Sequence, residues 1–175
     1  FETQLRSLVF RGYSVRTDFL GAPLDIVSWE ELLARITDAL SSRKGIVHCS
    51  LNALKVVEAR KDLNIKALLS RFDLITADGM SVVWGLRLLG RGTIKQIAGV
   101  ELMAELLRIG SREHWKFFLL GAEPCVSSEL QRCVQNAFPG VRIVGVQHGY
   151  FNRDEEPAIA ARIRNSGADI LLVGM

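Results

Sequence analysis

Asp78 is the residue of this sequence best placed to act as a general base. It follows the apolar run Asp73–Thr76 and precedes Gly79, which allows another group to approach closely. A carboxylate held there could take the proton from an attacking hydroxyl. The same position also suits a helix N-cap, because Asp side chains accept hydrogen bonds from the free amides of a first helical turn. The residues alone leave both interpretations open.

Ser50 and Asn52 follow an earlier apolar run and form a second candidate group. Their hydroxyl and amide suit the oxygens of a sugar or a phosphate. Both residue types are also common helix caps, and the bare pattern favours that role. We expect substrate binding here only if other residues point to the same edge of the molecule.

The turn formed by Gly121, Ala122 and Glu123 follows four apolar residues and opens a predicted helix. Backbone amides at such a turn favour an anion, for example a diphosphate. The glycines of a dinucleotide-binding GxGxxG fingerprint are absent.

His148, Gly149 and Tyr150 form a further loop, with a titratable ring and an aromatic side chain that could stack on a base or a sugar. A structural His and a core aromatic residue are the alternative.

The sequence indicates neither a metal site nor a cofactor. It contains no DxD triplet, HExxH helix, GxSxG elbow or Walker loop, and its three cysteines lack CxxC spacing. We therefore expect chemistry without a metal.

The elements that must position these loops alternate along the chain. Short apolar runs predict strands at 15–20, 45–50, 73–76, 116–120, 141–146 and 169–173, and helical spacing predicts helices at 28–40, 52–57, 63–69, 81–89, 100–109, 127–137 and 155–165. Ser28 is the predicted N-cap of the first of these helices. This alternation predicts an α/β fold, a Rossmann-like and mostly parallel sheet with helices on both faces. We expect one domain over residues 1–175, with 1–12 as an N-terminal extension, and all four loops at one rim of the sheet.

Composition narrows the function classes. With 49% hydrophobic and 23% charged residues, the chain can bury a core, and its net charge of +3 does not indicate nucleic-acid binding. No apolar run reaches the roughly 18 to 20 residues that span a bilayer.

From Val15 to Met175 the chain resembles the WecG/TagA/CpsF glycosyltransferases in the order and spacing of its segments. These segments are residues 50–60, 73–84, 98–102, 118–122, 138–140, 144–151 and 169–174. Ser50 stands where the family usually has threonine, and Gly99 lies in the family's Gly-x-Asp-Leu segment.

The resemblance implies inverting transfer of an N-acetylmannosamine-type sugar, or glucose, from a UDP-sugar donor to an undecaprenyl-diphosphate-linked saccharide. Asp78 matches the family's proposed base. The resemblance also implies a cytoplasmic protein peripheral to the inner face of the cell membrane, with oligomer formation left open.

Three departures qualify this expectation. Gln96 stands where a basic residue is expected, and Lys95 could supply the missing charge. Glu101 replaces the usual aspartate. The family also continues beyond this point into a C-terminal appendage associated with membrane docking, so we expect the chain to be a piece of a longer protein.

Two other hypotheses remain. One is a scaffold of a polysaccharide assembly complex that keeps the nucleotide pocket without turnover, as the changes at Ser50, Gln96 and Glu101 would allow. The other is a doubly wound enzyme that uses NAD or S-adenosylmethionine, against which the missing glycine fingerprint argues.

Overall fold

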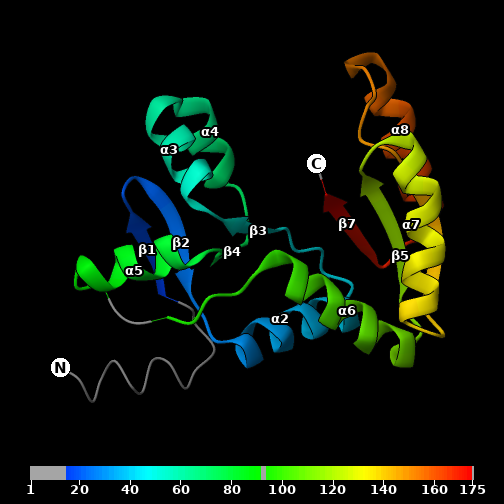
Figure 1. Ribbon diagram of the computed structural model, residues 1–175, viewed down its shortest axis with the longest axis horizontal. Coiled ribbons are helices and arrows are strands. Elements are labelled where there is room, and N and C mark those ends of the chain that lie inside the picture. Colours follow the sequence, from blue (N-terminus) through cyan, green and yellow to red (C-terminus); the bar gives the residue numbers. More distant parts are fainter. Residues whose placement is uncertain (1–14, 92–93, 175) are drawn as a thin grey trace. The chain divides into compact units, whose positions relative to one another are not determined.

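The computed structural model describes residues 15–91 and 94–174, which fall into two compact units divided between Glu101 and Leu102 (Figure 1). Helices and mainly parallel strands alternate along the chain, so the predicted α/β class is confirmed. The single domain over residues 1–175 stays a prediction, and the predicted N-terminal extension lies outside the described residues.

The first unit opens with an antiparallel hairpin of β1 (Val15–Phe19) and β2 (Ala22–Ile26). Leu20 and Gly21 turn the chain with φ angles of 53° and 94°, the left-handed backbone that tight hairpin turns require. The sequence predicted only the first of these strands. The second was missed because Pro23 and Asp25 resemble turn residues more than strand residues.

Helix α2 (Trp29–Ser41) begins where predicted. The Ser28 hydroxyl accepts a hydrogen bond from the Glu31 amide at 3.1 Å, which confirms the predicted cap. The carboxylate of Glu31 pairs with Arg35 at 3.0 Å one turn later.

A parallel pair, β3 (His48–Leu51) and β4 (Leu74–Ala77), forms the centre of the first unit, with α3 (Ala53–Lys61) and α4 (Leu63–Leu69) between the two strands in sequence. Strand β4 is buried along its whole length and leads through Asp78 and Gly79 into α5 (Met80–Leu88). The strand predicted at 45–50 begins three residues later, at His48, and ends at Leu51, so Ser50 lies inside the strand and not in the loop after it.

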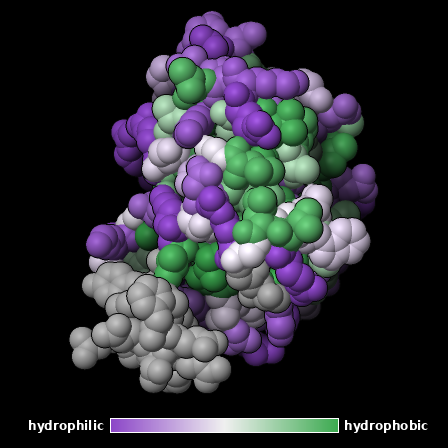
Figure 2. Space-filling model, turned by 90° about the vertical axis from the view of Figure 1, so that its left-hand side faces the viewer, coloured by the Kyte–Doolittle hydropathy of each residue, from purple (hydrophilic) through white to green (hydrophobic). Residues whose placement is uncertain are grey.

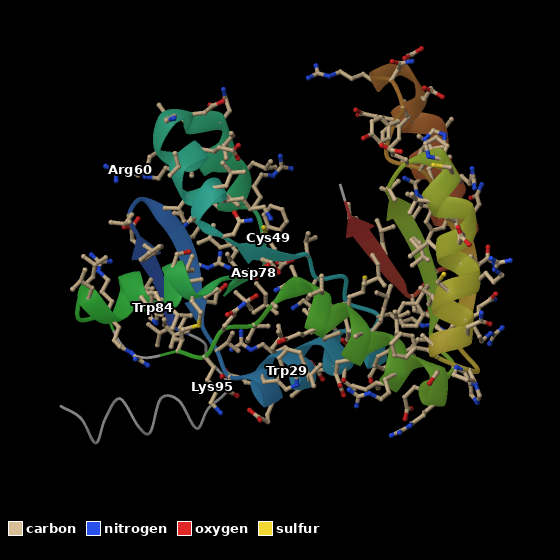
Figure 3. The ribbon with its side chains drawn as sticks, in the orientation of Figure 1. Trp29, Cys49, Arg60, Asp78, Trp84 and Lys95 are labelled. Atoms are coloured by element: carbon tan, nitrogen blue, oxygen red, sulfur yellow. The ribbon has the colours of Figure 1, made fainter. Side chains whose placement is uncertain are left out.

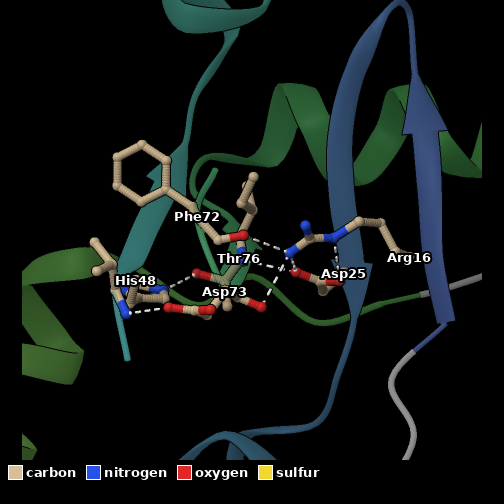
Figure 4. A network of polar contacts seen from close by, with 8 residues as sticks. Arg16, Asp25, His48, Phe72, Asp73 and Thr76 are labelled. Carbon is tan, nitrogen blue, oxygen red and sulfur yellow. Dashed lines mark hydrogen bonds and ion pairs between the residues drawn. The ribbon is translucent and has the colours of Figure 1, made fainter. Parts of the chain in front are cut away.

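An ion pair between the partly exposed Arg16 and the buried Asp25 links the hairpin to the parallel pair (Figure 4). Arg16 donates to both carboxylate oxygens of Asp25, at 2.9 and 2.7 Å, and to the carbonyls of Phe72 and Asp73 at 3.0 Å each. Asp25 also accepts from the Ile75 amide at 2.8 Å. Because Asp25 is only 3% exposed, these contacts replace the water that it loses on folding. They fix β4, and with it the approach to Asp78.

The second unit is built on three parallel strands in the order β6 (Arg142–Gln147), β5 (Lys116–Gly121) and β7 (Ile170–Gly174). Its helices are most of α6 (Gly99–Glu113), α7 (Pro124–Ala137) and α8 (Glu156–Asn165), with a short 3-10 helix, η1 (Arg153–Glu155), before α8. In parallel order, the three carboxyl ends share one edge.

Small residues let the elements of the second unit pack closely. A Cβ on Gly110 of α6 would lie 2.5 Å from the Phe117 ring, and a Cβ on Gly145 of β6 would lie 2.4 Å from the Phe118 ring. Both rings are fully buried. In the part of the chain that the structure describes, no helix is long and apolar enough to cross a membrane.

Candidate functional site

Asp78 lies directly beyond the carboxyl end of β4, as predicted (Figure 3). The N-cap residue of α5 is Gly79, whose φ of 98° is one that side chains rarely tolerate, and no side chain caps this helix. The alternative in which Asp78 caps the helix is therefore wrong. Its half-buried carboxylate is left available for another partner.

Three segments far apart in the sequence meet at this carboxylate. Asp78 Oδ2 lies 3.5 Å from the Gly99 amide, and a Cβ on Gly99 would lie 2.8 Å from Ser50 Oγ and 3.8 Å from Asp78 Oδ2. Backbone hydrogen bonds hold the segments together, from Asp78 to Leu51 and from Ile97 to Ala77, each at 2.9 Å. A hydroxyl, a carboxylate and a glycine amide thus lie together where two parallel strands end.

Asn52 is a helix N-cap, which is the role that the bare sequence pattern favoured. Its side-chain oxygen accepts a hydrogen bond from the Lys55 amide at 3.0 Å and caps α3. The side chain is otherwise exposed. Binding of a substrate by Asn52 stays a prediction.

Lys55 and His48 belong to this neighbourhood and were not predicted. The Lys55 ammonium is half-buried and donates to the Ser50 carbonyl at 2.8 Å. His48 Nε2 shares a hydrogen bond of 2.9 Å with the Thr76 hydroxyl. Burial, together with the charge of Lys55, lowers the pKa of His48 to about 4, so the ring is neutral near pH 7. The signal for Lys55 was its place in the first turn of α3, from which side chains point back toward the preceding residues.

Gln96 and Lys95 lie in different environments. Gln96 is half-buried, whereas Lys95 is exposed. The pKa of Glu30, at the start of α2, is lowered by hydrogen bonds from its own backbone and from Ser28, and further by the charge of Lys95. Lys95 therefore lies near the start of α2, where Figure 3 labels the neighbouring residue Trp29. Substrate binding by Gln96 stays a prediction.

The predicted loops of the second unit also come together. The Ala122 amide donates to the Gly174 carbonyl at 3.1 Å, and the Gly149 amide donates to the Ala122 carbonyl at 3.0 Å. Gly121 makes this approach possible, since a Cβ there would lie 1.9 Å from the Gly174 oxygen. These bonds join the ends of β5, β6 and β7.

A half-open hollow of about 250 Å³ lies over this junction and is lined by Ala122, Glu123, Gly149, Tyr150 and Gly174. Glu123 is the N-cap residue of α7, and its exposed side chain makes no capping hydrogen bond. Tyr150 is 68% exposed, so the core alternative for this aromatic residue is wrong.

His148 lies at the end of β6, and its Nδ1 atom is buried without a hydrogen-bond partner. Arg162 of α8 holds this strand end by donating to Gln147 Oε1 at 2.8 Å and to the Val146 carbonyl at 2.5 Å. Its guanidinium also lies 5.9 Å from the centre of the Phe118 ring. Sequence reasoning missed Arg162, whose helical position gave no signal of this contact.

Among residues 15–91 and 94–174, no group of three or more His, Cys, Asp or Glu side chains is arranged to hold a metal ion. In a comparison with known protein families, residues 17–175 match the family model described as "Glycosyl transferase WecG/TagA/CpsF family".

Proposed function

The chain belongs to the WecG/TagA/CpsF family of glycosyltransferases of cell-surface polysaccharide synthesis, and from this premise we propose that Asp78 is its catalytic base. The proposed reaction transfers a sugar from a UDP-sugar to a hydroxyl of an undecaprenyl-diphosphate-linked saccharide, without a metal ion. The donor sugar is of the N-acetylmannosamine type or glucose. The reaction would take place at the cytoplasmic face of the cell membrane.

The observation that carries this proposal is the placement of Asp78 with Ser50 and the Gly99 amide. Asp78 is half-buried, its amide and the Ala77 carbonyl are held by backbone hydrogen bonds, and it does not cap the helix that follows. A base needs that combination, because its carboxylate must be fixed and yet reach the substrate.

In the proposed step, the acceptor hydroxyl donates its proton to Asp78 while its oxygen attacks the anomeric carbon. The new carbon–oxygen bond forms as the bond to the UDP oxygen breaks, and UDP leaves with that electron pair. A single displacement with one carboxylate inverts the anomeric centre. The Ser50 hydroxyl would orient the acceptor.

The leaving diphosphate gains negative charge and needs stabilisation. Gln96 carries no charge, whereas the ammonium of Lys55 is half-buried and within hydrogen-bonding distance of the Ser50 carbonyl. We assign this stabilisation to Lys55. Substrate binding at the hollow of the second unit, beside Gly121, Ala122 and Glu123 and with Tyr150 stacking on a ring, stays a separate prediction.

The test measures UDP release from UDP-N-acetylmannosamine and UDP-glucose in the presence of a chelator, with a short-chain lipid-diphosphate saccharide as acceptor. We expect Asp78→Asn to lower turnover by about 10²- to 10⁴-fold while UDP still binds. Asp38→Asn, an exposed position on α2, is the matched control and should retain full activity. Equal turnover of the Asp78 variant and the control would exclude Asp78 as the base, and UDP binding with no turnover by the unmodified protein would favour the scaffold hypothesis.

A further inference from the structure

Helix α5 exposes a row of large apolar side chains to solvent. Met80, Trp84 and Leu88 follow one another at intervals of four residues and are 45%, 62% and 89% exposed. Such spacing places them on one face of the helix. Leu89, directly after the helix, is 47% exposed. We call these four residues the α5 stripe.

The opposite side of α5 packs in the hydrophobic core of the first unit. Val82, Val83 and Leu86 are buried and belong to the hydrophobic cluster that includes Phe19 and Leu24. The helix is thus apolar on two sides, of which only one is covered within the first unit. A helix that serves only to cover a core ordinarily presents polar residues to water.

The charged residues in the sequence segment that contains the stripe have one sign. From Gly79 through Val100 the sequence has no Asp or Glu but contains Arg87, Arg91 and Lys95. Arg87 lies in the last turn of α5 and is exposed, and Arg91 follows three residues after the helix. Figure 2 shows the side of the molecule on which α5 lies in Figure 1, with hydrophobic residues near its middle and hydrophilic residues around them.

Exposed Trp and Leu side chains beside arginines, with no acidic residue in the segment, suit the boundary of an anionic bilayer. The indole of Trp84 can lie among headgroups while Leu88 enters the acyl region. Nine residues make a helix of about 13 Å, which is too short to span the bilayer but long enough to lie on it.

We propose that the α5 stripe is a docking surface for an anionic lipid bilayer. This inference rests on the proposed function, in which Asp78 is the catalytic base. Helix α5 begins at Met80, only two residues after Asp78. A bilayer on this helix would bring a lipid-linked acceptor to the first unit with its diphosphate near Arg87 and its saccharide free to reach the base.

The first experiment measures co-sedimentation of the protein with vesicles of phosphatidylcholine, with and without one quarter phosphatidylglycerol. The unmodified protein should bind the anionic vesicles and bind them more weakly in high salt. Leu88→Ser should weaken binding about tenfold, since the variant lacks one large apolar side chain that would move from water into the bilayer. Leu63→Ser on α4 is the matched control, because Leu63 is 81% exposed, and it should bind like the unmodified protein.

The charge is tested in the same way. Arg87→Glu should weaken binding to anionic vesicles about tenfold, whereas Arg71→Glu, at another exposed position of the first unit, should not. Brominated lipids should quench part of the tryptophan fluorescence, and Trp84→Phe should remove the quenched part. Quenching that persists in this variant would place the contact elsewhere and overturn the proposal.

Other outcomes are equally decisive. Absence of vesicle binding by the unmodified protein overturns the proposal, and so does equal binding by Leu88→Ser and Leu63→Ser. An oligomer that dissociates in Leu88→Ser, without vesicle binding, would assign the stripe to a second copy of the chain. Transfer to a water-soluble acceptor separates this inference from the proposed function, because Trp84→Phe and Leu88→Ser should keep that activity. Vesicle binding without any sugar transfer would support the docking surface and refute the proposed glycosyltransferase activity.

Discussion

His48 should make the first unit sensitive to acid. Its ring lies on β3 in a hydrogen bond with Thr76, and burial with the charge of Lys55 lowers its pKa to about 4. In the unfolded chain a histidine has a pKa of about 6.5. Between these values the unfolded chain binds the proton and the folded chain does not. The contribution of His48 to stability is therefore complete above pH 6.5 and is lost as the pH falls toward 4.

The two pKa values give the size of the effect. Relative to pH 8, the loss is about 1.4 kcal/mol at pH 5.5 and about 3 kcal/mol at pH 4. A typical domain is stable by only about 5 to 15 kcal/mol. The predicted loss is therefore large enough to measure by denaturation.

The assay compares urea unfolding of the unmodified chain and His48→Gln at pH 8, 5.5 and 4, followed by hydrogen exchange of peptides from residues 46–59 and 72–78. The difference in unfolding free energy between the two proteins should shift in favour of the variant by the amounts above. His114→Gln, at an exposed position before β5, is the control and should show no such shift. A difference between His48→Gln and the unmodified chain that stays constant with pH would refute the reasoning.

Two further substitutions test the contacts that position Asp78. Gly99→Ala should lower kcat/KM at least about tenfold, because its Cβ would lie 2.8 Å from Ser50 Oγ and displace it. Adding Gly99→Ala to Ser50→Ala should cost little more than Ser50→Ala alone, and fully additive losses would contradict the contact. Asp25→Ala should destabilise the first unit by about 1 to 3 kcal/mol in urea unfolding, because the buried Ile75 amide loses its partner and the partly exposed Arg16 loses its counter-ion. Asp38→Ala, exposed on α2, should change little, and equal effects of the two would rule out the contacts of Asp25 as a source of stability.

The sequence by itself determined the local structure of this protein. Alternating apolar runs and helical spacing predicted the α/β class and most elements, because these patterns report which faces of a segment are buried. Ser28 and Asn52 were recognisable as caps, since a cap bonds only to amides two or three residues away. The place of Asp78 beyond a buried strand followed from the same local pattern.

Only the tertiary structure decided which of these residues meet. Ser50, Asp78 and Gly99 come together because β3 and β4 pair in parallel and the segment before α6 binds to the end of β4. Asp25 is buried because Arg16 lies opposite it in a hairpin that the sequence did not reveal. Arg162 likewise gained its role from a strand end that the fold brings to α8. Such contacts depend on pairing between distant segments, which periodicity and caps do not encode.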